Sequence, residues 1–201
     1  MNSNTFATAT AVNPELTPLE KEQARLYIQQ SRDGAIGATR GLSEAQWNFK
    51  PTPDRWSIAE ILEHVVFVQE RVLGPIWEQL SAAPPAPDWY DREQVDSIAM
   101  HRFPTRLMKF PAPEFALPNG RWTPSEALDR LAASSAALIE RLESSPDLRA
   151  HALEAAPLKA VSQGKYQWMD CYQWLVTAAA HTERHTKQML EVKASPDFPV
   201  N

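Results

Sequence analysis

The chain has 201 residues, of which 43% are hydrophobic and 22% are charged, as is typical of a globular protein with a buried core. Its formal net charge of -5 opposes binding to phosphates, so we expect no nucleic-acid partner. No uncharged apolar stretch reaches the roughly 18 residues that a membrane span requires, so we expect no membrane partner. The single cysteine, Cys171, excludes an intrachain disulfide and agrees with a cytoplasmic location.

The composition favours helices. The chain has only six glycines and many Ala, Leu, Glu and Gln residues, which lose little side-chain freedom in a helix. Its 17 prolines are therefore expected between helices. We predict a flexible N-terminal tail over residues 1–15, one helical domain over 16–195 and a C-terminal tail over 196–201.

Two capping sequences predict the first two helices. Thr17 can cap a helix that ends at Gly41, after which residues 42–55 contain two prolines and predict a loop. Ser57 and Glu60 form a second capping pattern, followed by apolar residues at helical spacing. This second helix is expected to end before Pro84.

The segment 82–121 is rich in proline and in aromatic residues, and only 92–102 is typical of a helix within it. We interpret it as a long crossover between the second and third helices. Its aromatic residues make it a candidate for a lid or an oligomer surface. These residues are Trp89, Tyr90, Phe103, Phe110 and Phe115.

Two further capping sequences predict the last two helices. Thr123 and Glu126 begin a helix with one apolar stripe that ends near Ser144. After an irregular stretch, Asp170 and Gln173 begin a helix that extends to about residue 193. Four amphipathic helices without a convincing alternating strand predict an all-α fold, a four-helix bundle.

Two histidines on the last helix form a candidate metal-binding pair. His181 and His185 lie four residues apart, so at about 100° per residue their directions differ by only about 40°. Both imidazoles therefore lie on one face, one turn apart, where they can share an ion. Such a pair is not specific, because histidines at this spacing also occur on surfaces and in packing.

His64 is the third candidate ligand. It lies in an apolar part of the second helix, where a buried imidazole needs partners for its nitrogens. The alternative interpretation is a core histidine bonded to a carbonyl or a carboxylate. When His64 is considered alone, this alternative is the favoured one.

The motifs around these histidines resemble those of the DinB-like superfamily. Residues 56–64 match a Trp-Ser-hydrophobic-x-Glu-hydrophobic-hydrophobic-x-His pattern, and residues 173–188 match a closing pattern of Gln-Trp-Leu, His-x3-His and Gln. The resemblance spans roughly residues 16–192. It implies an up-down-down-up bundle in which His64, His181 and His185 bind one divalent ion, and it implies a homodimer. Imidazole ligands suit Ni, Zn or Fe.

The resemblance suggests a metal-dependent hydrolase or a transferase of low-molecular-weight thiols that acts on a small-molecule substrate. The alternative is a non-catalytic dimeric bundle whose metal site is structural or vestigial. A third hypothesis is that the histidines bind no metal and bond to buried carbonyls. An open coordination position would favour catalysis, since structural sites are closed by protein ligands.

Other candidates have weaker support. Glu60 is the only candidate catalytic residue, as a base or a partner of His64, but the capping box is the favoured interpretation. We expect Glu183 to be a solvated carboxylate and Arg184 to face solvent or a dimer contact. Exposed or linker positions are expected for His101 and His151. The remaining residues are expected to be core residues rather than site residues: Cys171, Trp47, Trp56, Trp168 and Trp174.

Overall fold

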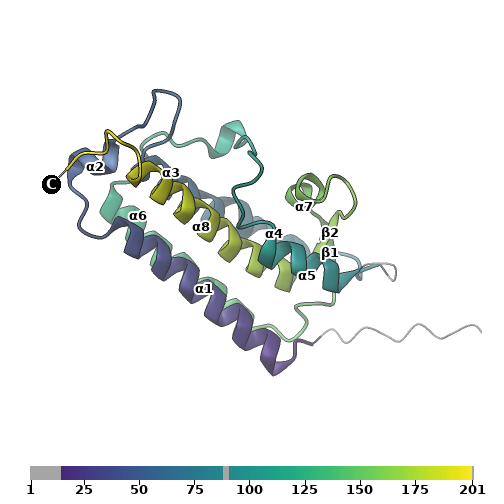
Figure 1. Cartoon of the computed structure of the whole chain (residues 1–201). Helices are drawn as coiled ribbons and strands as arrows, with labels where there is room; N and C mark the ends of the chain where they lie inside the picture. Colours follow the sequence, from purple (N-terminus) through teal and green to yellow (C-terminus); the bar gives the residue numbers. More distant parts are fainter. Residues whose placement is uncertain (1–14, 88–90, 201) are drawn as a thin grey trace, which may run out of the picture.

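The computed structural model describes residues 15–87 and 91–200. Residues 1–14 of the tail predicted over 1–15, and the crossover aromatics Trp89 and Tyr90, lie outside these ranges. Long helical segments lie side by side along the molecule (Figure 1). They are α1 (Pro18–Thr39), α3 (Ile58–Phe67) with its continuation, α6 (Pro124–Ser144) and α8 (Cys171–Lys193). The prediction of an all-α fold is confirmed.

Each of these helices begins at the predicted residue. Thr17, Ser57, Thr123 and Asp170 are the N-caps, and each forms a complete capping box with the side chain three residues later. A capping box satisfies two backbone N–H groups that have no partner within the helix. The local sequence therefore determines where the helices start.

The four long helices pack against one another. Helix α1 contacts α6 and α8, and α3 contacts the same two helices. The hydroxyl of Tyr27 donates a hydrogen bond to Glu183, and Lys193 Nζ donates one to the Ala38 carbonyl. Since both residue numbers increase from the first contact to the second, α1 and α8 run in the same direction.

Two apolar clusters form the core, and they are separated on α8. The first cluster includes Ala180 and earlier residues of this helix, and the second resumes at Met189. Residues 181–188 therefore form a polar interval between two apolar regions.

The predicted second helix changes its geometry midway. Helix α3 continues into η1 (Val68–Leu73), a π-helix, and then into α4 (Gly74–Ser81). Within η1, the buried Gln69 donates to Thr182 Oγ1 over 2.8 Å and accepts from Ser134 Oγ over 2.5 Å. The sequence did not predict this irregularity, because apolar spacing alone does not distinguish a local π turn from an α turn.

Short elements occur where the sequence predicted loops. The 42–55 segment contains α2 (Glu44–Asn48), and the stretch before α8 contains α7 (Ala156–Val161). An antiparallel pair of strands, β1 (Ala152–Glu154) and β2 (Trp168–Asp170), also lies there. The sequence showed no convincing alternating pattern for these two strands. Strands of three residues are too short to show an alternating pattern.

A buried cluster of charges fixes the start of α8. Arg149, 2% exposed, donates to Asp96 over 3.0 and 2.8 Å, to Asp170 over 3.0 Å and to Glu20 over 2.6 Å. We call these four residues the Arg149 cluster. It connects α1, α8 and α5 (Arg92–His101), the helix predicted within the crossover.

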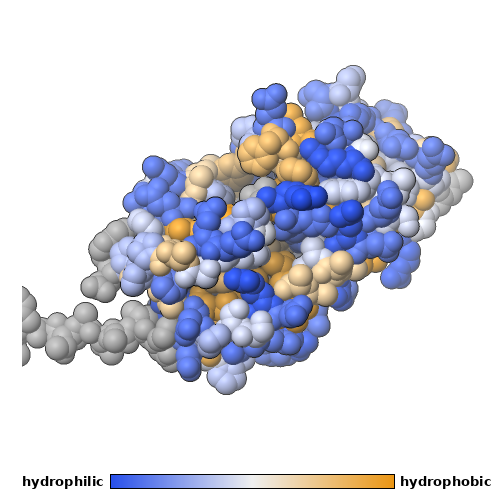
Figure 2. Space-filling model, turned by 180° about the vertical axis from the view of Figure 1, so that it is seen from behind, coloured by the Kyte–Doolittle hydropathy of each residue, from blue (hydrophilic) through white to orange (hydrophobic). Residues whose placement is uncertain are grey.

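The later part of the crossover passes over α3 and α8 and contains the single turn η2 (Glu114–Ala116). In the described ranges, no helix is both long and apolar enough to cross a membrane. Figure 2 shows a mostly hydrophilic surface on one face of the molecule, with small hydrophobic groups between the charged residues.

Candidate metal centre

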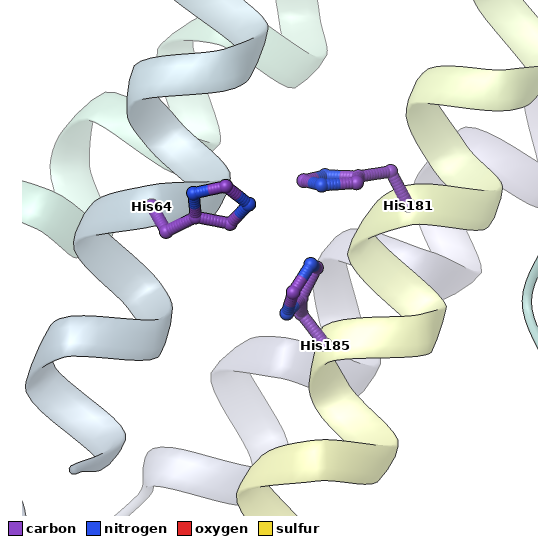
Figure 3. A group of neighbouring side chains, drawn as sticks. All are labelled: His64, His181 and His185. Carbon is purple, nitrogen blue, oxygen red and sulfur yellow. The ribbon is translucent and has the colours of Figure 1, made fainter. Parts of the chain in front are cut away.

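The three predicted histidines come together between α3 and α8. One potential ligand atom from each of His64, His181 and His185 lies within 4.8 Å of the other two. The ring centroids of His181 and His185 are 4.4 Å apart, and that of His64 is 5.2 and 4.8 Å from them. Figure 3 shows the three imidazoles pointing toward one another from the two helices. We call them the histidine cluster.

The side chains of the histidine cluster are shielded from solvent. His64 is 5% exposed and His185 is 8% exposed, while His181 is partly buried. The ring of Trp56 lies 5.0 Å from that of His64, centroid to centroid. The imidazoles are therefore largely shielded from water, where an unpartnered polar atom is costly.

Two of the histidines have hydrogen-bond partners at Nδ1. His64 Nδ1 lies 2.9 Å from the carbonyl oxygen of Ala116, and His185 Nδ1 lies 2.9 Å from Oε1 of Gln188. Both contacts leave Nε2 free for a ligand. His181 Nδ1 is buried and has no hydrogen-bond partner among the described residues. These donors suit a divalent ion, because such an ion binds neutral imidazoles and coordinates ring nitrogens that have no hydrogen-bond partner.

The electrostatic surroundings keep all three imidazoles neutral. Burial is the main cause that lowers the pKa of each ring, and the pKa values of His181 and His185 fall well below the ordinary value. His64 also lowers the pKa of His181 and of His185, and His181 lowers that of His185. Nearby guanidinium groups of Arg121, Arg184 and Arg106 add to the effect. Neutral imidazoles are the form that binds a metal ion.

Glu60 has a structural role. Its Oε2 accepts a hydrogen bond from the backbone N–H of Ser57 over 2.8 Å, and its Oε1 pairs with Lys50 Nζ over 2.7 Å. The favoured capping interpretation is therefore confirmed. Both carboxylate oxygens have partners away from the histidine cluster.

Two neighbouring residues on α8 differ from expectation. Glu183 accepts a hydrogen bond from the Tyr27 hydroxyl over 2.7 Å and pairs with Lys187, so it is more than a solvated carboxylate. Arg184 is buried, donates to the Met108 carbonyl and places its guanidinium 5.3 Å from the centre of the Phe110 ring. Of the two alternatives expected for Arg184, exposure to solvent was wrong, because the crossover covers the side chain, and a dimer contact stays a prediction.

The remaining candidates lie outside the histidine cluster. His101 is exposed, and His151 Nδ1 bonds to the Ala83 carbonyl over 2.6 Å. Cys171 is buried, as expected, and burial raises the pKa of its thiol to about 11. Of the four candidate tryptophans, Trp47 and Trp56 pack against the second apolar cluster, and Trp168 is partly buried. The most buried is Trp174, in the first apolar cluster.

Sequence reasoning missed the residues that support the ligands. Ala116 and Arg106 belong to the crossover, where irregular structure gives no spacing that predicts contacts. Glu63 was also missed. It is 3% exposed, its carboxylate accepts backbone N–H bonds from Asn119 and Gly120, and it pairs with Arg121. A buried glutamate in an apolar helix needs hydrogen-bonding or charged partners, so the position of Glu63 could have indicated that the crossover contacts it.

A separate cavity of about 450 Å³ lies between α6 and the η1–α4 segment. Its lining includes Gln69, Glu70, Trp77, Ser134 and Arg141 and none of the three histidines. This cavity is thus separate from the histidine cluster.

A comparison with known families identifies a relationship to this chain. The family model described as DinB superfamily matches residues 27–189, a range that contains all three clustered histidines. No curated protein and no solved structure matches the chain.

Proposed function

Because the chain belongs to the DinB superfamily, we propose that His64, His181 and His185 bind one divalent transition-metal ion that serves a reaction on a small molecule. One observation carries this proposal: three neutral imidazoles converge in a buried cluster, and one of their ring nitrogens lacks a partner among the described residues. An unsatisfied buried polar group costs about 1–3 kcal/mol, which ligation offsets. Ni, Zn and Fe all suit such donors.

The number of donors supports a reactive site rather than a structural one. In the described part of the chain, no carboxylate or thiol joins the three histidines, whereas structural zinc sites have four protein ligands. When bound, a divalent ion supplies Lewis acidity, which polarises a substrate or lowers the pKa of water or of a thiol. The residues of the chain favour the neutral form of the imidazoles, and Ala116 and Gln188 orient those of His64 and His185.

We propose hydrolysis, or transfer to a low-molecular-weight thiol, as the reaction class, in keeping with the family resemblance. Two assays separate these classes. A hydrolase releases product without added thiol, whereas a transferase consumes thiol in proportion to an electrophilic substrate. The homodimer and the cytoplasmic location remain predictions.

Elemental analysis of the purified, tag-free protein tests the metal site. We expect near-stoichiometric nickel, zinc or iron in the wild type, and none in a His64→Ala, His181→Ala, His185→Ala variant. A His101→Ala, His151→Ala variant is the matched control, because it removes the two histidines outside the cluster and is expected to keep the metal. A wild type without metal, even after reconstitution, would contradict the proposal.

A further inference from the structure

One oxygen atom of Gln188 accepts two hydrogen bonds. Arg106 Nη1 donates to Gln188 Oε1 over 3.2 Å, and His185 Nδ1 lies 2.9 Å from the same atom. A guanidinium has only donors, so the amide atom that contacts Arg106 must be the oxygen and not the nitrogen. His185 Nδ1 must then carry the proton, which leaves the lone pair on Nε2.

Arg106 is itself held in place by α8. Its Nε and Nη2 donate to the two carboxylate oxygens of Glu191 over 3.0 and 2.9 Å. Such a two-point contact fixes the plane of the guanidinium. Because Glu191 lies nearly one turn beyond Gln188, the third nitrogen of Arg106 reaches the Gln188 amide. The crossover thereby determines the orientation of an amide on α8.

The same segment makes an equivalent contact on α3. The Ala116 carbonyl can only accept, so His64 Nδ1, at 2.9 Å, must also carry a proton. The backbone N–H groups of Asn119 and Gly120 donate to Glu63 over 2.8 and 2.9 Å, which holds this part of the crossover against α3. Two ligand histidines on different helices thus depend on one irregular segment.

We propose that the crossover over residues 103–121 sets the metal affinity of the histidine cluster by imposing the Nδ1-protonated tautomer on His64 and His185. Arg106 and Gln188 are positioning residues in this arrangement, and neither is a ligand. The inference rests on the proposed metal site for its effect on affinity. The assignment of the two tautomers concerns the metal-free protein and does not depend on the proposed function.

Zinc affinity, measured by competition with a chromophoric chelator, tests the first component. Loss of the partner of a metal-binding histidine weakens affinity by about 10–100-fold, and we expect this loss for Gln188→Leu. Gln188→Glu keeps an acceptor and is expected to bind zinc as tightly as the wild type. For Arg106→Met we expect roughly tenfold weaker binding, because the amide can then turn its nitrogen toward His185.

Arg55→Met is the matched control. Arg55 also pairs with Glu191, over 3.6 Å, and no hydrogen bond joins it to Gln188 in the described residues. We expect this variant to keep the wild-type zinc affinity. Equal losses for Arg55→Met and Arg106→Met would overturn the inference, as would wild-type affinity in a folded Gln188→Leu variant. Circular dichroism of each variant verifies folding.

Long-range ¹H–¹⁵N correlation spectra of the metal-free protein test the second component, since they identify which ring nitrogen carries the proton. We expect Nδ1 protonation for His64 and His185 in the wild type. Arg106→Met and Gln188→Leu should change His185 and leave His64 unchanged. A wild-type His185 protonated on Nε2 would overturn the inference. If the wild type binds no zinc, the proposed function fails while this measurement still decides the tautomers.

Discussion

Helix α8 carries two buried polar clusters that differ in how completely their atoms are paired. In the Arg149 cluster, at the start of the helix, the guanidinium has carboxylate partners on three sides. In the histidine cluster, ten residues further on, the rings are neutral, and His181 Nδ1 lacks a partner among the described residues. Natural proteins pair nearly all of their buried polar atoms. The paired charges of the Arg149 cluster therefore favour stability, and the unpaired nitrogen of the histidine cluster supports the metal ligation proposed above.

Arg149→Met should give the largest effect on stability. It leaves three carboxylates near one another without their shared cation, and breaking a buried pair in this way costs about 3–5 kcal/mol of unfolding free energy. Urea unfolding followed by circular dichroism measures the loss. Arg130→Met is the control, because its exposed pair with Glu70 should be worth about 0–1 kcal/mol. Similar losses for both variants would contradict the stabilising role assigned to the Arg149 cluster.

A metal ion should complete the histidine cluster and stabilise the protein. At a free zinc concentration of 100 times the dissociation constant, we expect the unfolding free energy to rise by about 2.7 kcal/mol. Urea unfolding with buffered zinc and with a chelator measures the difference. The triple histidine-to-alanine variant should show no rise. An equal rise in that variant would place the zinc elsewhere.

His181→Leu should have little or no cost in the metal-free protein. The substitution removes an unpartnered buried nitrogen, so the unfolding free energy should stay within about 1 kcal/mol of the wild type or increase. Gln173→Leu is the contrasting variant. Gln173 is fully buried and bonds to Asp170 and Asp96, so we expect it to lose about 1–3 kcal/mol. The opposite ranking would show that His181 has a partner in solution.

Glu60→Gln should give the smallest effect. Glutamine can replace glutamate in a capping box, and the pair with Lys50 is partly exposed. We expect less than about 0.5 kcal/mol of lost stability and unchanged metal content. A large loss of bound metal would instead indicate that Glu60 supports His64.

The starts of the helices and the three histidines could be predicted because their causes are local. Ser57 and Asp170 satisfy N–H groups within three residues, and His181 and His185 share a face through helical geometry alone. The position of His64 opposite them followed from family motifs and not from spacing. Tertiary contact then brings the three rings together.

The surroundings of the ligands could not be predicted in the same way. Ala116 and Arg106 reach the histidine cluster from a segment without regular structure, and their contacts join residues 52 and 82 positions apart. No periodic pattern encodes such contacts. The buried position of Arg184 was missed for the same reason, since the covering residues belong to that segment.

The π-helix η1 has a consequence for chain length. A π turn closes its hydrogen bonds over five residues instead of four, so η1 accommodates more chain than an α-helix of the same length. Removing one residue from 68–73 would rotate α3 against α4 by about 100°. His64 and Trp77 could then no longer both keep their present neighbours on α8 and α6. The number of residues between His64 and Trp77 thus determines whether His64 can face His181 and His185.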